Sequence, residues 1–298
     1  MDLSDDVVSI VAPAYNHEKY IIDALSSIAR QTYYNKELII IDDCSKDSTA
    51  AWIERYLGRG IVHELFPAGI HFIRHPENRN AHRTLNEGIE MASGKYVSII
   101  NTDDCYEENR LEVMVEALQR SRARLAFSRV RCIDGEGKYT EEPAFEERRS
   151  LLNRYPSPSF ALAVTNVAIG TGNFIFEKTL CQEIGGFCQD YHFIHDWDFV
   201  LKSTAVCEPV YAEDTCYLYR FHATNTIKQI GESQENERRK DREVRAVLLN
   251  FLNTIRNGKA QNPLLRDIHT WDYFFRLIPG EYCSFLWRQL EEKEQHGI

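Results

Sequence analysis

The 298-residue sequence lacks several features that would each assign it to a class of protein. It contains no apolar run of about 18 residues, so no segment is expected to span a bilayer. It has no basic excess either, because 45 acidic residues outnumber 35 lysines and arginines and leave a formal net charge of −10. Broad binding of nucleic acid needs a basic field on the protein, so we expect no nucleic-acid partner.

The eight cysteines form no CxxC pair and no compact framework. They stand among residues typical of strands and helices, which favours reduced, buried thiols over disulfides or a zinc site. The first ten residues are acidic rather than basic and lead directly into an apolar run, so a secretory signal is not expected. These absences favour a cytoplasmic protein, with peripheral contact at the inner face of the membrane left open.

The sequence has the composition of an ordinary globular protein, with 43% hydrophobic and 27% charged residues. Short apolar runs alternate with stretches whose apolar residues have helical spacing. The runs lie at 7–12, 37–41, 70–73, 96–100 and 125–132, and the helical stretches at 17–31, 48–57, 81–91 and 109–121. The runs show no clean alternation of apolar and polar residues, which indicates strands buried on both faces. The sequence thus predicts an α/β fold with a mostly parallel sheet flanked by helices.

The second half of the sequence is less regular. Residues 134–160 are rich in Gly, Glu, Arg and Pro, which predicts a long surface connection that acts as a mobile flap. Further along, Gly185 is expected to start a helix, and residues from His195 onward are expected to form an amphipathic one.

The tail is predicted to be helical. The densely charged segment 232–245 indicates a solvated helix or a hinge, and apolar residues have helical spacing over 244–255 and 269–290. Packing onto the preceding domain is the simplest role for this tail, and dimerisation and contact with a membrane surface are the alternatives. The apolar residues available for such a membrane contact are Phe274, Phe275, Leu277, Phe285, Leu286 and Trp287.

Polar clusters follow three of the predicted strands, at residues 13–16, 42–45 and 101–104. Ligands of open α/β sheets bind beyond the carboxyl ends of the strands, so we expect one site at this edge. A single pair of carboxylates there is most simply a turn or a helix cap. Two pairs, at 42–43 and 103–104, would repel each other unless a cation or a polar ligand lies between them.

The strand-end motifs resemble those of family 2 glycosyltransferases, and the resemblance covers about residues 7–225. The matching segments are 8–16, 25–28, 31–33, 37–49, 77–79, 85–89 and 92–96. The resemblance implies a GT-A fold, which is Rossmann-like, over residues 1–228, followed by a C-terminal helical extension over 229–298. Within the GT-A domain, the nucleotide-binding half would span about 1–132 and the acceptor half about 133–228.

The resemblance also implies a reaction, the transfer of a sugar with inversion from a nucleoside-diphosphate sugar to a hydroxyl group. The donor is commonly a UDP-sugar, and the acceptor would be a glycan, a lipid-linked intermediate or a protein. A divalent metal, Mn²⁺ or Mg²⁺, would neutralise the departing diphosphate. An aspartate would take the proton of the acceptor hydroxyl.

On the donor side, the resemblance implies a nucleotide pocket at the strand ends. Its residues would be Pro13, Ala14, Tyr15, Asn16, Asp43, Asn86, Asp103 and Asp104. Asp43 would bond the edge of the base. The metal ligands would be Asp103, Asp104 and His222. The simpler interpretation of Asn86 is a polar residue that packs or caps a helix.

On the acceptor side, the general base would be Asp196, at the start of a helix. A carboxylate there is expected to stay ionised, because the helix dipole and the free amides favour the anion. Residues near the acceptor or the diphosphate would be Gly172, Asn173, His195, Trp197, Arg220 and His222. Simpler interpretations are a helix cap for Asp196, a core residue for Trp197 and a structural histidine for His222.

Three residues depart from the family's pattern: Asn101 replaces an aspartate, Asn80 a glycine and His195 a glutamate. Two other functions fit parts of the pattern. A nucleotidyltransferase shares the layered sheet but needs a Gly-rich loop with Lys or Arg after the first strand, which residues 13–17 do not provide. A non-catalytic nucleotide-sugar-binding or scaffold protein is the second alternative.

Overall fold

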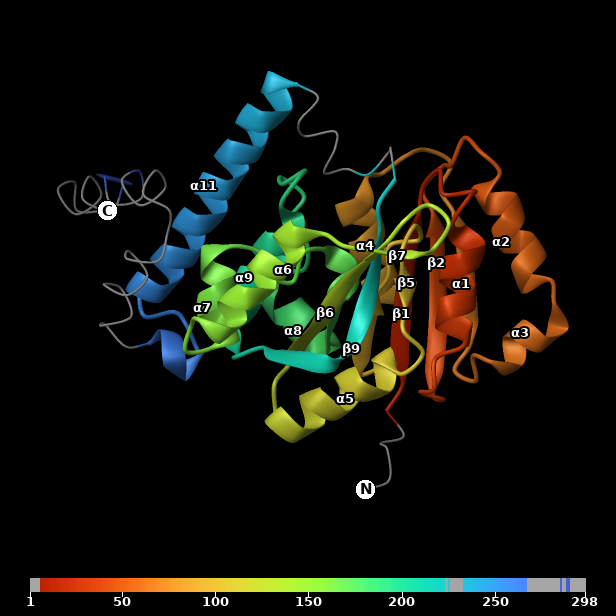
Figure 1. Ribbon diagram of the computed structural model, residues 1–298, viewed down its shortest axis with the longest axis horizontal. Helices are drawn as coiled ribbons and strands as arrows, with labels where there is room; N and C mark the ends of the chain where they lie inside the picture. Colours follow the sequence, from red (N-terminus) through yellow and green to blue (C-terminus); the bar gives the residue numbers. More distant parts are fainter. Residues whose placement is uncertain (1–5, 223–224, 226–232, 267–284, 286–287, 290–298) are drawn as a thin grey trace.

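The structure is a computed structural model that describes residues 6–222, 225, 233–266, 285 and 288–289 (Figure 1). Nine strands of the described chain form one sheet in the order β3-β2-β1-β4-β8-β6-β9-β5, with β7 paired to β6. The strands span Val8–Ala14 (β1), Lys36–Asp42 (β2), Ile70–Arg74 (β3), Tyr96–Ile99 (β4), Cys105–Tyr106 (β5), Leu125–Ile133 (β6), Tyr139–Thr140 (β7), Phe174–Glu177 (β8) and Val210–Arg220 (β9). All five runs predicted to be strands are confirmed, as β1 to β4 and β6.

The longest strand pairings in this sheet are parallel. β3, β2, β1 and β4 run side by side in the same direction, and β9 runs parallel to β6. The short β8 lies between β4 and β6 and is antiparallel to both. These pairings confirm the mostly parallel sheet expected from the sequence.

Helices cover both faces of the sheet (Figure 1). Neighbouring residues of β1 face opposite sides, since Ile10 packs into one core and Val11 into the other, and both are completely buried. This burial explains why the strands show no polar alternation. One face carries α1 (Ile21–Ala29), α2 (Thr49–Leu57), α3 (Gly60–Glu64) and α5 (Arg110–Ser121), and the other carries α4 (Ala81–Met91), α7 (Pro158–Val164), α8 (Lys178–Ile184) and α9 (His195–Val206).

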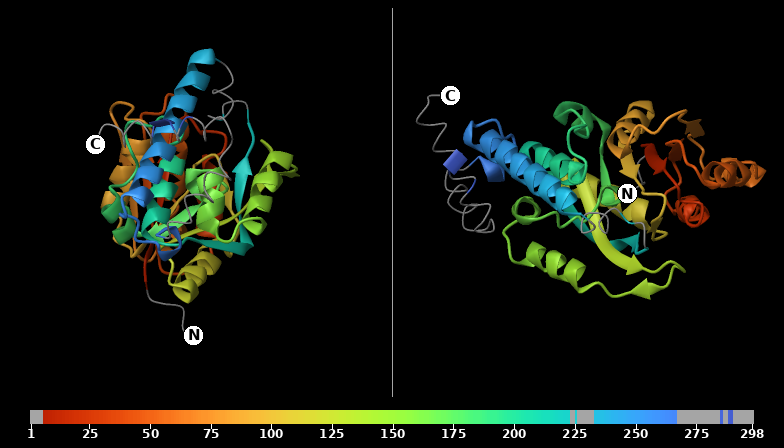
Figure 2. Two further views of the ribbon diagram at one scale, coloured as in Figure 1. Left: turned by 90° about the vertical axis from the view of Figure 1, so that its left-hand side faces the viewer. Right: turned by 90° about the horizontal axis from the view of Figure 1, so that it is seen from above.

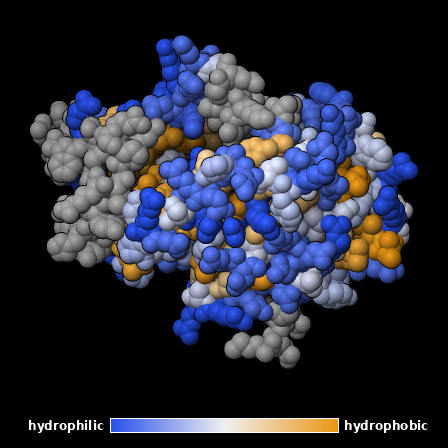
Figure 3. Space-filling model, in the orientation of Figure 1, coloured by the Kyte–Doolittle hydropathy of each residue, from blue (hydrophilic) through white to orange (hydrophobic). Residues whose placement is uncertain are grey.

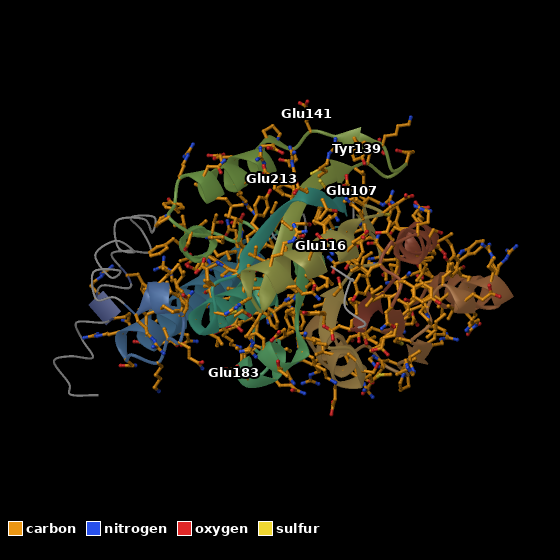
Figure 4. All side chains as sticks on the ribbon, turned by 90° about the horizontal axis from the view of Figure 1, so that it is seen from below. Glu107, Glu116, Tyr139, Glu141, Glu183 and Glu213 are labelled. Carbon is orange, nitrogen blue, oxygen red and sulfur yellow. The ribbon has the colours of Figure 1, made fainter. Side chains whose placement is uncertain are left out.

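The connection over 134–160 contains more regular structure than the sequence predicts. β7 turns back on β6, and α6 (Pro143–Ser150) follows it. Proline suits the first turn of this helix, and the buried ring of Phe145 packs against Tyr219. Tyr139 of β7 lies at the outer edge of the molecule in Figure 4, where the guanidinium of Arg131 stacks on its ring. The region is therefore a hairpin and a helix rather than the plain surface flap expected.

Gly185 ends a helix instead of starting one. α8 stops at Ile184, and Gly185 and Gly186 have φ angles of 79° and 68°. A left-handed backbone terminates a helix, and glycine adopts it without a steric penalty. The prediction of a helix start at Gly185 was therefore wrong, whereas the helix expected from His195 is confirmed as α9.

The charged and apolar parts of the tail form one continuous helix, α11 (Gln234–Arg256), capped at its start by the side chain of Ser233. Its apolar face shares a core with α9, for example through Val247 and Leu201. Figure 2 shows the two helices side by side at one end of the molecule. Packing onto the preceding chain is thus confirmed for α11, and Phe285 reaches the same core.

Several expectations fall on residues that the structure does not describe. Among the residues predicted for a membrane contact, Phe274, Phe275, Leu277, Leu286 and Trp287 lie outside the described part, and so does the boundary between 228 and 229. No helix within the described residues is long and apolar enough to cross a membrane. The seven described cysteines are free thiols, and four of them are buried.

The face of the molecule shown in Figure 3 is mostly hydrophilic. Its right-hand edge carries an apolar area at α3, where Ile61 is 67% exposed and Leu65 is 38% exposed. Single exposed apolar side chains are normal on soluble domains, so these two residues do not by themselves define a binding surface.

Gly88 allows α4 to lie close to β1. A methyl group added at this position would come within 2.5 Å of Val11 Cγ1. We expect Gly88→Ala to lower the free energy of unfolding by about 1–3 kcal/mol, measured by urea denaturation, because overpacking outweighs the better helix propensity of alanine. Gly60→Ala is the control, since its new methyl group would meet no described atom within 4 Å. Equal stability of the two variants would contradict this account of the packing.

Candidate active site

Hydrogen bonds join the loops that follow β1, β2 and β4. The Asn16 N–H donates to Ser45 Oγ at 3.0 Å, and Asn16 Oδ1 accepts from the Lys46 N–H at 2.7 Å. Thr102 Oγ1 in turn donates to the carbonyl of Pro13 at 3.0 Å. The three polar clusters identified in the sequence therefore meet at one edge of the sheet. At this edge Tyr15 is 42% exposed, whereas Ala14 is buried beneath it.

Asp103 lies beside two histidines. Its Oδ2 is 3.0 Å from Nε2 of His222 and 3.8 Å from Nε2 of His17. Its Oδ1 is buried and has no hydrogen-bond partner among the described residues. Burial favours the neutral acid, but the attraction of His17 and His222 outweighs it and holds the pKa of Asp103 below its ordinary value. Asp103 is therefore an anion with one oxygen left for a ligand.

Asp104 points into the protein instead. Its Oδ2 accepts from the Tyr217 hydroxyl at 2.5 Å and from Nδ2 of Asn101 at 3.3 Å, and its Oδ1 accepts from the Arg220 N–H at 2.7 Å. Burial, helped by the charge of Asp103, raises the pKa of Asp104 well above its ordinary value. Both oxygens have protein donors, so of the three predicted metal ligands only Asp103 and His222 lie together.

Arg220 is completely buried, and all five of its donors are used by the protein. It therefore holds several segments together beneath the site, and it has no donor left for the diphosphate it was predicted to face. The acceptors are the carbonyl oxygens of Asp103, Asp134 and Gly135, the carboxylate of Asp23 and Sγ of Cys105, at 2.8, 3.2, 3.2, 3.1 and 3.5 Å.

Asp196 lies in the first turn of α9, and both of its oxygens are held. Its Oδ1 accepts from the Trp197 N–H and its Oδ2 from Nδ2 of Asn166, each at 2.8 Å. Burial raises the pKa of Asp196 to about 6, although these bonds and the charge of Arg148 on α6 act in the opposite direction. Burial thus raises the pKa of Asp196 by more than the amides at the helix terminus lower it.

The phenol of Tyr219 is buried near the end of β9. Burial raises its pKa, and the charges of Asp104 and Asp103 raise it further.

Three residues predicted on the acceptor side serve the fold. Trp197 is buried, and its Nε1 donates to the Leu162 carbonyl at 2.7 Å, so the ring is a core residue and not a platform for a sugar. Asn173 is fully buried and bonds Ser128 through both its amide atoms. Gly172 leaves room for Tyr217, because an added methyl group would come within 1.9 Å of the Tyr217 hydroxyl.

Asn86 and His195 complete the predicted set. The Asn86 amide bonds the N–H and the carbonyl of Phe187 at 2.9 and 2.8 Å, so it ties α4 to the loop after α8 and does not face a donor. His195 Nε2 lies 3.4 Å from Thr171 Oγ1, and its Nδ1 is buried without a described partner. Burial lowers the pKa of His195, which favours a neutral ring.

Asp43 is nearly buried at the end of β2. Its Oδ1 accepts from the Arg79 N–H at 2.8 Å and lies 2.7 Å from Nδ1 of His75. Nε2 of His75 lies 3.0 Å from Oε2 of Glu87 on α4. Asp43 is thus the first member of a chain of charged residues that leads away from the strand ends.

The fit of a divalent cation can be judged from the donor atoms. No three His, Cys, Asp or Glu side chains of the described residues are placed to hold a metal ion by themselves. Asp103 nevertheless offers an unpartnered buried oxygen beside the imidazole of His222. Mg²⁺ and Mn²⁺ accept one or two protein ligands and take the rest from phosphate and water. The residues therefore fit a cation that arrives with a diphosphate.

Sequence reasoning missed several residues of this region. His17 directly follows the first polar cluster, and that position was a usable signal. Tyr217 and Tyr219 lie on β9, which was not predicted. Two tyrosines two residues apart are too short a pattern to indicate a strand. Asn166 and His75 carried no signal, because their partners, Asp196 and Asp43, are 30 and 32 residues away along the chain.

Fold and site together define a class of protein. The structure matches that of S. aureus TarS 1–349 in complex with UDP-GlcNAc with a TM-score of 0.58 at 17% identity, covering 97% of this chain and 92% of that one. Similarity at this level shows the fold alone, which is the GT-A fold of glycosyltransferases. The expectation of a GT-A fold is thus confirmed.

The chain itself belongs to glycosyl transferase family 2, whose family model matches residues 9–185. It is 31% identical over 122 residues to the putative teichuronic acid biosynthesis glycosyltransferase TuaG of Bacillus subtilis, covering 41% of this chain and 46% of that protein. It is 24% identical over 202 residues to the Escherichia coli UDP-Glc:alpha-D-GlcNAc-diphosphoundecaprenol beta-1,3-glucosyltransferase WfgD, covering 67% and 69%. The chain thus spans less than half the length of TuaG, and about two thirds of WfgD.

Arg220→Lys tests the structural role of the arginine. We expect it to lower the free energy of unfolding by about 3 kcal/mol, measured by urea denaturation, because lysine keeps the charge but cannot supply five planar donors to a buried site. The matched control is Arg148→Lys. Arg148 is half-buried and makes no hydrogen bond or ion pair with described residues, so its change should matter little. An Arg220→Lys protein as stable as the control would show that these donors are dispensable.

Proposed function

We propose that the chain is an inverting glycosyltransferase that moves a sugar from a UDP-sugar to a hydroxyl group. The observation that carries the proposal is the buried, unpartnered oxygen of Asp103 beside His222 at the strand ends, in a chain that belongs to glycosyl transferase family 2. Asp103 is kept anionic beside two histidines, whereas burial brings the pKa of Asp196 to about 6. Two acids separated in this way suit two different roles in one reaction.

The donor would lie across the strand ends. Tyr15 presents an exposed ring and Asn16 an exposed amide at the place expected for the base, and Asp43 offers a carboxylate to its edge. Asp103 and His222 would hold Mn²⁺ or Mg²⁺ together with the diphosphate, and the cation would neutralise the charge on the leaving group. TarS has been solved with UDP-GlcNAc, and the name of WfgD specifies UDP-Glc, which supports a UDP-sugar as donor.

Asp196 would act as the general base. Its carboxylate, oriented by Asn166 and the Trp197 N–H, accepts the proton of the acceptor hydroxyl as the hydroxyl oxygen attacks the anomeric carbon. The bond from that carbon to the diphosphate breaks on the opposite side, and the bonding electrons leave with the diphosphate. Attack and departure on opposite faces invert the anomeric centre.

The acceptor would be a hydroxyl of a lipid-linked saccharide or a growing polysaccharide. WfgD is named for a lipid diphosphate acceptor and TuaG for the synthesis of teichuronic acid, and these names support this class over a protein acceptor. An acceptor of this kind lies at a membrane surface, so the chain would work in the cytoplasm with peripheral contact at the membrane.

Asp196→Asn is expected to reduce release of UDP from UDP-glucose or UDP-GlcNAc about a hundredfold or more, because an amide cannot take up the acceptor proton. The fold should not be weakened. Because the pKa of Asp196 is raised in the folded protein, its ionised carboxylate opposes folding above about pH 6. Replacing it with a neutral amide removes this unfavourable contribution. In the wild type, turnover should fall as the pH decreases through about 6, where Asp196 is protonated.

Asp190→Asn is the matched control, because Asp190 is exposed in the loop before α9. It should keep both the rate and the pH profile of the wild type. A wild-type rate in Asp196→Asn would refute the assignment of the base. If neither the wild type nor the variants release UDP, the result would favour a non-catalytic binding protein.

A UDP-sugar with Mn²⁺ should raise the melting temperature by several degrees, and should do so more than either alone, because ligands that bind only the folded state stabilise it. The measurement is a thermal-shift screen of UDP-, GDP- and dTDP-sugars with and without Mn²⁺. Asp103→Asn should lose the Mn²⁺-dependent part of the shift.

The control for this screen is Asp214→Asn, an exposed position on β9 that should keep the full shift. A metal-dependent shift that survives in Asp103→Asn would remove Asp103 from the metal site. A larger response to GDP- or dTDP-sugars would correct the donor.

A further inference from the structure

A buried histidine stands behind the carboxylate proposed to bond the base. His75 directly follows β3, and only 2% of its side chain is exposed. Its Nδ1 lies 2.7 Å from Oδ1 of Asp43, and its Nε2 lies 3.0 Å from Oε2 of Glu87. Both ring nitrogens therefore face carboxylate oxygens, and the reaction proposed above uses neither His75 nor Glu87.

The two contacts of the His75 ring show what it does in the fold. Carboxylate oxygens accept hydrogen bonds, so each of the two contacts ties one ring nitrogen of His75 to an acceptor on a different element. Glu87 also accepts from Nη1 of Arg79 at 3.1 Å. The side chain of Asp43 is only 5% exposed, and a buried carboxylate of this kind needs such partners.

The protein contacts only one of the two carboxylate oxygens of Asp43. Its Oδ1 accepts from both His75 and the Arg79 N–H, and Nδ2 of Asn78 donates to the Asp43 carbonyl at 3.1 Å. No described donor contacts Oδ2. The carboxylate is thus fixed with one oxygen satisfied by the protein and the other left as an acceptor.

We propose that His75, supported by Glu87, is a positioning residue that makes Asp43 select the base of the donor. The inference rests on the proposed function, since it assumes that a nucleotide lies at the strand ends. Uracil carries an N–H at ring position 3 that can donate to a fixed carboxylate oxygen. Cytosine carries a lone pair at the same ring position, which a carboxylate repels. The arrangement therefore favours uracil over cytosine, and a site built around one hydrogen bond rejects the analogue that lacks it.

Two substitutions separate the two bonds of the ring. The amide nitrogen of asparagine lies near the position of histidine Nδ1, so His75→Asn should keep the bond to Asp43. Glutamine reaches further, to the position of Nε2, so His75→Gln should keep the bond to Glu87 and lose the bond to Asp43. A purely structural histidine would not make base selection depend on which bond is kept.

The experiment is titration calorimetry of UDP and CDP, each with Mn²⁺, on the full chain. The wild type should bind UDP about tenfold or more tightly than CDP. His75→Asn should keep most of this preference, and His75→Gln should lose most of it. His71→Gln is the control, because it makes the same change at an exposed position of the same strand and should leave the ratio unchanged.

The possible results are distinguishable. A His75→Gln protein with the wild-type ratio, or equal ratios in both His75 variants, would overturn the inference. If the His75 variants do not fold, Glu87→Gln takes their place, since it weakens the support of His75 at a half-buried position, and an unchanged ratio there would overturn the inference as well. A wild type that binds UDP and CDP equally would refute only this inference, whereas one that binds neither would refute the proposed function.

Discussion

The site depends on one buried polar group, the carboxyl group of Asp104. A carboxylate taken out of water destabilises a fold by several kcal/mol unless donors surround it, and here Tyr217, Asn101 and the Arg220 N–H provide them. These bonds fix the backbone of the acidic loop. Because its neighbour is held by these bonds, Asp103 is fixed beside His222, with one buried oxygen that has no partner among the described residues. The two adjacent aspartates thus have opposite roles, one in the architecture and one toward a ligand.

The three carboxylates discussed above belong to the same residue type but have different neighbours. Asp103 has two histidines, Asp43 has a histidine and a backbone amide, and Asp196 has burial with only neutral donors in contact. The environment of Asp103 holds its pKa below the ordinary value, whereas burial raises the pKa of Asp196 to about 6. In the proposed reaction, one residue type would therefore serve cation binding, base recognition and proton transfer within a single fold.

Sequence reasoning predicted much of the fold but fewer of the side-chain roles. Apart from the short α3 and β5, the strands and helices before residue 133 follow from local patterns, since burial on both faces leaves a clear apolar run. β9 and the end of α8 at Gly185 were missed, because β9 is interrupted by the polar residues 213–215 and a glycine cap has a weak local signal. The meeting of three strand-end loops at one edge of the sheet was predicted correctly. The roles of Arg220 and Asn86 were not, because their hydrogen-bond partners are as far as 197 and 101 residues away.

The position of β8 has a consequence for how the chain is assembled. This strand comes from the later half of the sequence, yet it lies between β4 and β6 and pairs with both. A chain shortened after residue 132 would leave the edges of β4 and β6 without a partner, and open strand edges promote association between molecules. The segments before and after residue 132 therefore build one sheet together, and a chain cut between them would lack one of its inner strands.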